Sequence, residues 1–428
     1  MKIVRITLFT LLAALVAVGV STTSYAFHSG GVAECGGCHS MHSPAGGGGN
    51  FLLVGTDKSS ACLTCHEHAG DTGPSSYHIS TAAVDMPAGT APLQRTPGGD
   101  FGWLKKIYNF AIRGTATTDD GAEFGHDITA IDFGYTGRSN NPSTAPGGTF
   151  PTAQLACNSC HDPHGQYRRL TTGIVSLTGA PIKASGSYNA AANEPDATGA
   201  VGVYRLLAGS GYTKGGVTFP GVPAAKVPSS YNRTEAATQT RVAYGVATTG
   251  GHATWGNWCG TCHTGMHSNG NYVHPVDQGM SSLMATAYDS YVKTGDASGT
   301  HASSFSSLAP FASNTGVYAT LAASAGNAGG AANVGPTSGD QVMCLSCHRA
   351  HATGFKEMLR WEQEYEFITK ADSTGTTTYG GTDSTLPTDT TLGRGRTNAE
   401  KVASYYGRPA SNFATYQRVL CNKCHVKD

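Results

Sequence analysis

All twelve cysteines of this 428-residue chain fall into six pairs with the spacing C-x-x-C, and a histidine follows each pair directly. We number these motifs 1 to 6 in chain order. The pairs are Cys35/Cys38, Cys62/Cys65, Cys157/Cys160, Cys259/Cys262, Cys344/Cys347 and Cys421/Cys424. The histidines are His39, His66, His161, His263, His348 and His425. Because C-x-x-C-H is the attachment signal of a c-type haem, the pattern predicts six covalently bound haems.

The spacing of the motif fits the chemistry of haem attachment. On a helical turn the residues i, i+3 and i+4 share one face, so both thiols can reach the two vinyl groups at one edge of a porphyrin. The histidine then ligates the iron as the proximal ligand. A disulfide scaffold or a zinc site would also use paired cysteines, but neither requires a histidine at this position. We therefore favour haem.

Eleven further histidines lie outside the motifs, and six of them suffice to give each iron a second, distal imidazole. His42, His164 and His351 each lie three residues after a motif histidine. Trans ligation puts the two nitrogens on opposite porphyrin faces, each about 2 Å from the iron, which a three-residue step on the same side cannot achieve. We expect these three histidines to ligate an adjacent haem.

The other distal candidates lie away from the motifs. They are His78, His126 and His274, with His267 and His68 in reserve. We rank His28, His252 and His301 lower, because His28 lies at the predicted mature N-terminus and the other two lie in glycine- or serine-rich stretches. With all six irons bis-histidine ligated, no iron has an open position for a substrate, so we expect no enzymatic activity.

The composition predicts a chain that cannot build an ordinary core. Only 39% of the residues are hydrophobic and 13% are charged, while 57 are glycine. We therefore expect a mostly irregular fold with a few short α-helices and little or no β-sheet, wrapped around a chain of six haems whose apolar faces replace the core. Helical periodicity is convincing only over 102–113, 278–293, 355–371 and 398–407, with a last short helix leading into motif 6.

The N-terminus predicts export. Residues 1–26 combine Lys2 and Arg5, an apolar run and a small-x-small cleavage signal at Ser24-Tyr25-Ala26, as in a secretory signal peptide. We expect residues 27–428 to form a single hexahaem domain. No later run is long and apolar enough to span a membrane. The mature chain is almost neutral, which makes nucleic acid an unsuitable partner.

Long stretches between the motifs resemble one family of cytochromes. They include FHSGGVAEC, CHEHAGDTGPSSYHIS, TPGGDFGW, YNRTEAATQTRVAYG, CLSCHRAHATGF and LCNKCHVKD. This pattern is similar to the OmcS/OmcT-type hexahaem c-type cytochromes of the outer surface of Geobacter-like bacteria, which form extracellular nanowires. The resemblance spans essentially the whole mature chain and fails to match only around residues 248–258.

The resemblance implies a loop-built protomer with bis-histidine haems in alternating stacked and T-shaped pairs. It implies head-to-tail polymerisation into an extracellular filament, in which His42 ligates a haem of the neighbouring protomer. The implied partners are other copies of the chain, other multihaem cytochromes and extracellular electron acceptors such as metal oxides.

Two other functions compete with an electron conduit of this kind. A soluble periplasmic multihaem electron shuttle would have the same haems but would never polymerise. A multihaem reductase would need one open iron or an altered motif such as C-x-x-C-K, whereas all six motifs here end in histidine.

Overall fold

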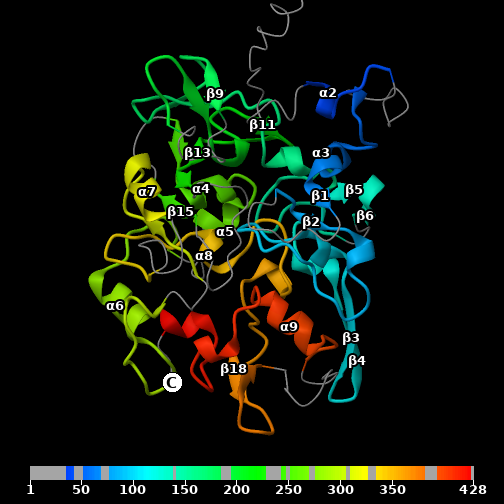
Figure 1. The fold of residues 1–428 in the computed structure, drawn as a ribbon, viewed down its shortest axis with the longest axis vertical. Helices are drawn as coiled ribbons and strands as arrows, with labels where there is room; N and C mark the ends of the chain where they lie inside the picture. The colour runs from blue at the N-terminus through cyan, green and yellow to red at the C-terminus, as the bar shows by residue number, and fades with distance from the viewer. Residues whose placement is uncertain are drawn as a thin grey trace, which may run out of the picture.

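A computed structural model describes residues 35–42, 52–68, 77–137, 141–184, 194–227, 242–246, 251–268, 275–304, 309–325, 334–380 and 393–425. The predicted signal peptide, His28 and His274 lie outside the described residues. Within them, short helices and strands are separated by long irregular segments (Figure 1). The expectation of a mostly irregular chain with few helices is therefore confirmed.

In the described part of the chain, the α-helices are at most nine residues long. They are α2 Cys35–Cys38, α3 Lys58–His66, α4 Trp255–Gly260, α5 Thr264–Ser268, α6 Ser282–Ser290, α7 Tyr318–Ser324, α8 Cys344–Cys347 and α9 Asn398–Ser404. Single turns of 3-10 helix include η3 Phe101–Lys105, η7 Cys157–Ser159, η8 Tyr204–Leu206, η11 Lys356–Met358 and η13 Leu420–Lys423. Polar caps start the longer helices. Asp57, for example, accepts hydrogen bonds from the Ser59 and Ser60 amides at the start of α3.

The strands form several small sheets of two to four strands. They are β1 Glu67–His68, β2 Ser80–Thr81, β3 Ile107–Ile112, β4 Thr115–Asp120, β5 Thr129–Ala130, β6 Tyr135–Thr136, β7 Arg168–Arg169, β8 Val175–Ser176, β9 Ile182–Ala184, β10 Ala200–Gly202, β11 Thr213–Lys214, β12 Val217–Thr218, β13 Val222–Pro223, β14 Ala225–Lys226, β15 Ala243–Gly245, β16 His252–Ala253, β17 Ala312–Ser313, β18 Thr369–Ala371 and β19 Thr377–Tyr379. The expectation of little or no sheet is not confirmed. A strand of two or three residues is too short to show a period of two, so the sequence gives no signal for it.

The helix predicted over 102–113 is wrong. The segment begins with η3 and continues as β3, which forms an antiparallel hairpin with β4. Tyr108 and Phe110 are buried while their neighbours in β3 are exposed, which is the alternation of a strand. Arg113 and Gly114 between the strands have φ values of 49° and 82°, as a type I′ hairpin turn requires.

The helix predicted over 355–371 is also wrong. Glu357 and Met358, which lie within the turn η11, have φ values of 51° and 61°, and these values are incompatible with a continuous α-helix. The Met358 carbonyl instead accepts a hydrogen bond from the Arg349 amide, so tertiary pairing overrides the local periodicity. The predicted segments 278–293 and 398–407 do contain α6 and α9, and motif 6 lies on η13.

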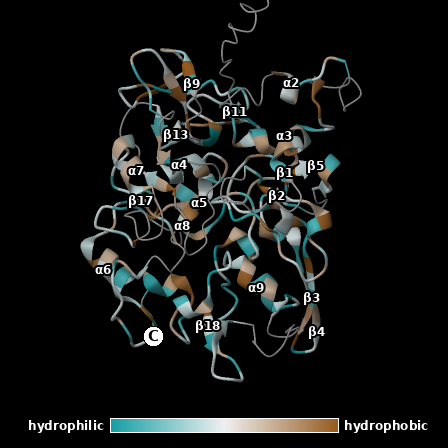
Figure 2. Cartoon of the chain, viewed as in Figure 1, coloured by the Kyte–Doolittle hydropathy of each residue, from teal (hydrophilic) through white to brown (hydrophobic). Residues whose placement is uncertain are grey.

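Buried hydrophobic residues form separate clusters rather than one core, and Figure 2 shows hydrophobic segments scattered along the chain. Each larger cluster adjoins cysteine motifs. Leu63 of motif 2 is fully buried and packs in a cluster that Cys157 of motif 3 also contacts. Leu345 of motif 5 packs against the cluster that contains Trp255 of α4, and Leu420 of η13 belongs to the C-terminal cluster. Within the described part of the chain, no helix has the length and apolar character needed to cross a membrane.

A buried carboxylate ties the β3–β4 hairpin to the segment before α9, and Figure 1 shows the two side by side. The Asp119 side chain is fully buried and receives ion pairs from Arg394, Arg396 and Lys356 at 3.0 to 3.1 Å. Burial alone would raise the pKa of Asp119. Hydrogen bonds from Arg394 and Lys356, together with the charge of Arg396, outweigh burial and hold this pKa below its usual value.

We predict that Asp119→Asn lowers the free energy of unfolding by about 3–5 kcal/mol, because it leaves cations buried without their carboxylate. The matched control is Glu123→Gln, which removes a half-exposed partner of Lys356 and should cost at most about 1 kcal/mol. The Asp119 stabilisation is present above about pH 4 and is lost as the pH falls through the lowered folded-state pKa. Urea unfolding at neutral and acid pH measures both effects. Equal losses in the two variants at neutral pH would contradict the prediction.

Candidate haem-binding sites

Each cysteine pair lies on one tight turn that its histidine closes. The amide of the motif histidine donates to the carbonyl of the first cysteine in motifs 1, 3, 4, 5 and 6, at 2.8 to 3.2 Å. In motif 2 the whole sequence from Cys62 to His66 lies within α3. The first cysteine and the histidine therefore face the same side of the turn, as attachment of one porphyrin edge and its iron requires.

The structure gives no support to the disulfide or zinc alternatives. All twelve cysteines carry free thiols in this structure. Among the described residues, no group of three or more histidine, cysteine or acidic side chains gathers around a point where a bare metal ion could bind. The donor set of each motif, two thiols and one imidazole, instead fits a haem that is bound by two thioethers and one axial histidine.

Thiols of neighbouring motifs come into contact in pairs. The first thiol of motif 2, Cys62, hydrogen-bonds with the first thiol of motif 3, Cys157, and this bond together with burial raises the pKa of Cys62. Likewise, Cys259 of motif 4 hydrogen-bonds with Cys344 of motif 5, which raises the pKa of Cys259 together with burial. The first cysteines therefore meet at the 2–3 and 4–5 junctions.

At the other junctions, the second cysteine of the earlier motif lies within electrostatic reach of a cysteine of the next motif. The pKa of Cys38 is raised by burial and then by Cys65, and that of Cys160 rises to about 12 through burial and then Cys262. The pKa of Cys347 rises to about 12 through burial and then through the cysteines of motif 6. Thus the six motifs follow one another in space in the order in which they follow along the chain, with alternating kinds of junction.

Backbone carbonyls orient most of the motif histidines. Nδ1 of His66 lies 2.8 Å from the Tyr77 carbonyl, and Nδ1 of His161 lies 2.8 Å from that of Arg205. The same contact joins His263 to Pro146 at 2.9 Å and His348 to Glu357 at 2.7 Å. An Nδ1–H that donates to a carbonyl leaves Nε2 as the metal-binding nitrogen, so these rings are prepared for axial ligation.

Two of the predicted distal histidines face motif histidines across a gap that suits an iron. The ring centroids of His161 and His351 are 6.4 Å apart, and those of His263 and His126 are 6.1 Å apart. Two imidazoles on opposite sides of one metal, each about 2 Å from it, place their centroids about 6 Å apart. Nδ1 of His126 also contacts the Ala350 carbonyl at 2.7 Å, which leaves its Nε2 for a metal.

Desolvation keeps these two histidines neutral. It lowers the pKa of His126 to about 4 and that of His351 to about 3. A neutral imidazole is the form that ligates iron, so the surroundings of both rings favour ligation.

The other predicted distal histidines are placed less completely. His78 is buried, and its charge helps to lower the pKa of His66 after burial, so the two rings lie within electrostatic reach. His42 and His164 are exposed, and His42 ends the first described segment. His274 lies outside the described residues.

The reserve and lower-ranked histidines have other contacts. Nε2 of His267 lies 3.0 Å from an Asp277 carboxylate oxygen, and His252 uses both ring nitrogens against the Val222 and Gly173 carbonyls. Nδ1 of His301 lies 2.8 Å from Asp289. The backbone of His68 pairs with Thr81 in the β1–β2 sheet, and its side chain lies outside the description. The low rank of His252 therefore has a physical reason, since neither of its nitrogens is available.

The carbonyls that orient the histidines could not have been found from the sequence. Each contact uses a main-chain oxygen, which every residue type carries. The residues are Tyr77, Pro146, Arg205, Glu357 and Ala350. Only the path of the folded backbone decides which carbonyl groups lie beside the histidine rings.

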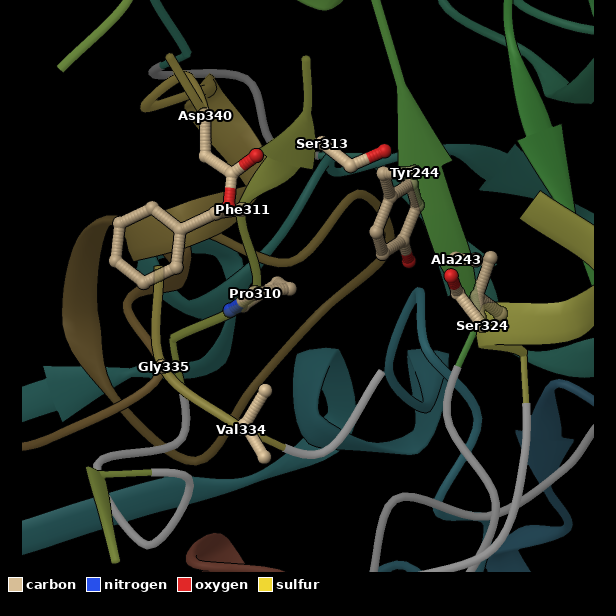
Figure 3. Close-up of a pocket in the computed structure, with 10 residues that line it drawn as sticks. Ala243, Tyr244, Pro310, Phe311, Ser313, Ser324, Val334, Gly335 and Asp340 are labelled. Carbon is tan, nitrogen blue, oxygen red and sulfur yellow. The ribbon is translucent and has the colours of Figure 1, made fainter. Parts of the chain in front are cut away.

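A pocket between β15 and β17 is separate from these sites. Figure 3 shows Tyr244, Phe311, Ser313 and Asp340 among the residues around it, and no cysteine or histidine lines it. Its volume of about 80 Å³ is far too small for a porphyrin.

Comparisons with known proteins give one consistent answer, although no protein-family model matches the chain. The chain is 51% identical over 426 residues to the C-type cytochrome OmcS of Geobacter sulfurreducens, covering 95% of both sequences. It is similar to the solved structure of the OmcS nanowires from Geobacter sulfurreducens, with a TM-score of 0.82 and 51% identity over 94% of this chain and 100% of that one. A second structure, the outer membrane cytochrome S filament of the same organism, gives a TM-score of 0.79 at 50% identity with the same coverage. Identity and coverage at this level show that the chain belongs to the OmcS family of c-type cytochromes, which carry covalently attached haem.

Proposed function

We propose that this protein is an extracellular electron conduit, in which protomers with six bis-histidine haems join head to tail into a filament. It is exported through the signal peptide of residues 1–26 and carries electrons to extracellular acceptors such as metal oxides. Other multihaem cytochromes would supply the electrons. The observation that carries the proposal is the unbroken spatial order of the six motifs, with thiols of neighbouring motifs in contact or within electrostatic reach.

Each motif would hold one haem through its two cysteines and its histidine. When bound, a haem takes up and releases one electron at its iron. The chain contributes position, because it fixes neighbouring attachment points against one another, and neutrality, because carbonyls and desolvation keep the ligating imidazoles uncharged.

The histidine pairs support a specific set of distal ligands. His351 would complete the site of His161, and His126 that of His263. His78 would complete the site of His66, from which it is separated by eleven residues of the same segment. His274 is the remaining candidate for the site of His425.

The histidines that follow motifs 1, 3 and 5 would each ligate the haem that is held two motifs earlier. His351 follows motif 5 and faces motif 3, two motifs earlier. The same step takes His164 from motif 3 to motif 1. It takes His42 from motif 1 to motif 5 of a neighbouring protomer, since its own chain has no earlier motif. The site of His348 would thus be completed across the protomer interface, which is a heterologous contact that does not close and so propagates.

The rival functions predict different iron coordination or assembly. A multihaem reductase would keep one iron open in its working state, whereas every motif here has a histidine candidate for its distal position. A periplasmic shuttle would have no reason to expose His42 on a terminal segment. Electron microscopy of the secreted protein separates the shuttle from the filament.

We predict that His126→Ala converts one haem per chain from low spin to high spin, because the site of His263 loses its distal ligand. The control is His252→Ala, which removes a histidine whose two nitrogens contact carbonyls and should leave all haems low spin. Low-temperature electron paramagnetic resonance counts the high-spin ferric haems. An unchanged spectrum for His126→Ala would show that His267 or His68 takes that position.

We predict that His42→Ala abolishes or shortens the filaments while six haems remain covalently attached to each chain. The removed imidazole is the proposed ligand across the interface, and its loss should leave one haem per chain without a distal histidine. The control is His301→Ala, which removes another partly exposed histidine. Electron microscopy and haem quantification give the two readouts. Long filaments of His42→Ala with all haems low spin would contradict the assignment of His42 as the ligand across the interface.

We predict that the chain does not fold stably without haem, because its hydrophobic clusters are small and adjoin the attachment motifs. Expression without the haem-attachment machinery should give a degraded or disordered product. Hydrogen exchange is the measurement, and broad amide protection in the haem-free chain would refute the prediction.

A further inference from the structure

Motif 6 carries a lysine between its two cysteines, whereas the intervening residues of motifs 1 to 5 are all uncharged. In those five motifs the residue before the second cysteine is also small. These residues are Gly37, Thr64, Ser159, Thr261 and Ser346. In motif 6 the same position is Lys423. One of the six predicted haem sites therefore has a cation built into its attachment turn.

The side chain of Lys423 lies inside the protein, with an exposed fraction of only 4%. Its Nζ donates a hydrogen bond to the Tyr291 carbonyl at 2.8 Å. The same Nζ lies 4.8 Å from the ring centroid of Tyr288 and 5.8 Å from that of Tyr291, and both tyrosines are buried. A carbonyl dipole and two aromatic rings stabilise a buried ammonium without cancelling its charge.

An acidic residue balances the charge of Lys423 only in part. Helix α6, which carries Asp289, packs against η13, and Figure 1 shows the two elements side by side. The two oxygens of the Asp289 carboxylate hydrogen-bond with Nδ1 of His301 and with the Ser304 hydroxyl, each at 2.8 Å. Burial lowers the pKa of Lys423 to about 8, against the opposing charge of Asp289, so the ammonium keeps its proton at neutral pH.

A buried positive charge favours the reduced form of a redox centre close to it, because reduction adds a negative charge. Lys423 precedes the motif histidine His425 by two residues, which span at most about 7 Å of chain. For a unit charge on the order of 10 Å from an iron and an effective dielectric constant of about 20, Coulomb's law gives a change of roughly tenfold in the ratio of reduced to oxidised haem.

We propose that Lys423 sets the energy of one step in the electron conduit: its ammonium, held by Tyr291 and the ring of Tyr288, raises the reduction potential of the haem at motif 6. An electron on the protomer is thereby drawn towards the site of His425. In a filament this favoured site recurs once in every protomer. The inference rests on the proposed haem chain and adds a residue that shapes its energy profile.

The test is a spectroelectrochemical titration of the haem-loaded protein at pH 7, with Lys423→Met compared with the unmodified chain. Methionine keeps much of the length of the side chain but removes its charge. We expect the potential of one haem in six to fall by about 59 mV, which corresponds to a tenfold change for one electron. The control is Lys183→Met, which removes a surface cation of β9 that pairs with Asp196 and should leave all six potentials unchanged.

Two further variants separate charge from packing. Lys423→Arg retains the positive charge and should leave the potential of the motif-6 haem close to that of the unmodified chain. Asp289→Asn removes the charge that partly balances Lys423, so it should raise the potential of the same haem. A residue that acted only through packing would not produce shifts of opposite sign in Lys423→Met and Asp289→Asn. Low-temperature electron paramagnetic resonance checks that all haems of each variant remain low spin.

The outcomes distinguish this inference from the proposed function. Unchanged potentials in Lys423→Met, or an equal fall in Lys423→Arg, overturn the role of the charge and leave the conduit standing. If Lys423→Met does not retain its haems, Asp289→Asn decides alone, and a potential that stays the same or falls overturns the inference. Absence of filaments from the unmodified chain overturns the conduit itself.

Discussion

In the proposed arrangement, coordination of each haem iron by two histidines from separate segments is the constraint on which the rest of this fold depends. The clearest pair, His161 and His351, joins motif 3 to a residue that follows motif 5, and the rings face one another at 6.4 Å. A chain with 57 glycines and scattered hydrophobic clusters gains little from burial of its own side chains. Thioethers and iron–imidazole bonds can supply the long-range restraints that a continuous core supplies in other proteins. Short helices and two-residue strands suffice once those restraints are in place.

The backbone is strained near the proposed haem sites. Arg205 and Glu357, whose carbonyls orient His161 and His348, have φ values of 48° and 51°. Each such residue costs on the order of 1–3 kcal/mol, and strain of this kind persists where the surroundings fix the conformation. Here the adjacent bridges of Leu207 and Leu359 hold the strained residues in place. Strain, carbonyl orientation and ligand geometry are therefore parts of one local structure.

The parts of this protein that could be predicted from sequence are those with short, fixed spacing. The cysteine pairs, their histidines and the restricted reach of His351 follow from the geometry of a single turn and of trans ligation. The segments 102–113 and 355–371 could not be predicted, because Tyr108 and Phe110 alternate in a hairpin and Met358 pairs with Arg349 across the chain. Sequence ranks His252 below His126 only because His252 lies in a glycine-rich stretch. The contacts of both His252 nitrogens leave no sequence signal, because the carbonyls come from Val222 and Gly173 in distant segments. The antiparallel bridges of His39 with Leu53, His161 with Leu207 and His348 with Leu359 are also backbone features. They could not be predicted from sequence, because the three leucines lie at different distances from their motifs.

In the proposed filament, a ligand that reaches the next protomer couples assembly to iron coordination, and this coupling can be measured on the unmodified protein. Low-temperature electron paramagnetic resonance should be recorded on intact filaments and on the same material dissociated into folded protomers, with the high-spin ferric haem quantified per chain. The account predicts none in filaments and one per chain in protomers, because only the site of His348 depends on a neighbour for its distal histidine. High-spin haem in intact filaments, or fully low-spin protomers, would contradict it.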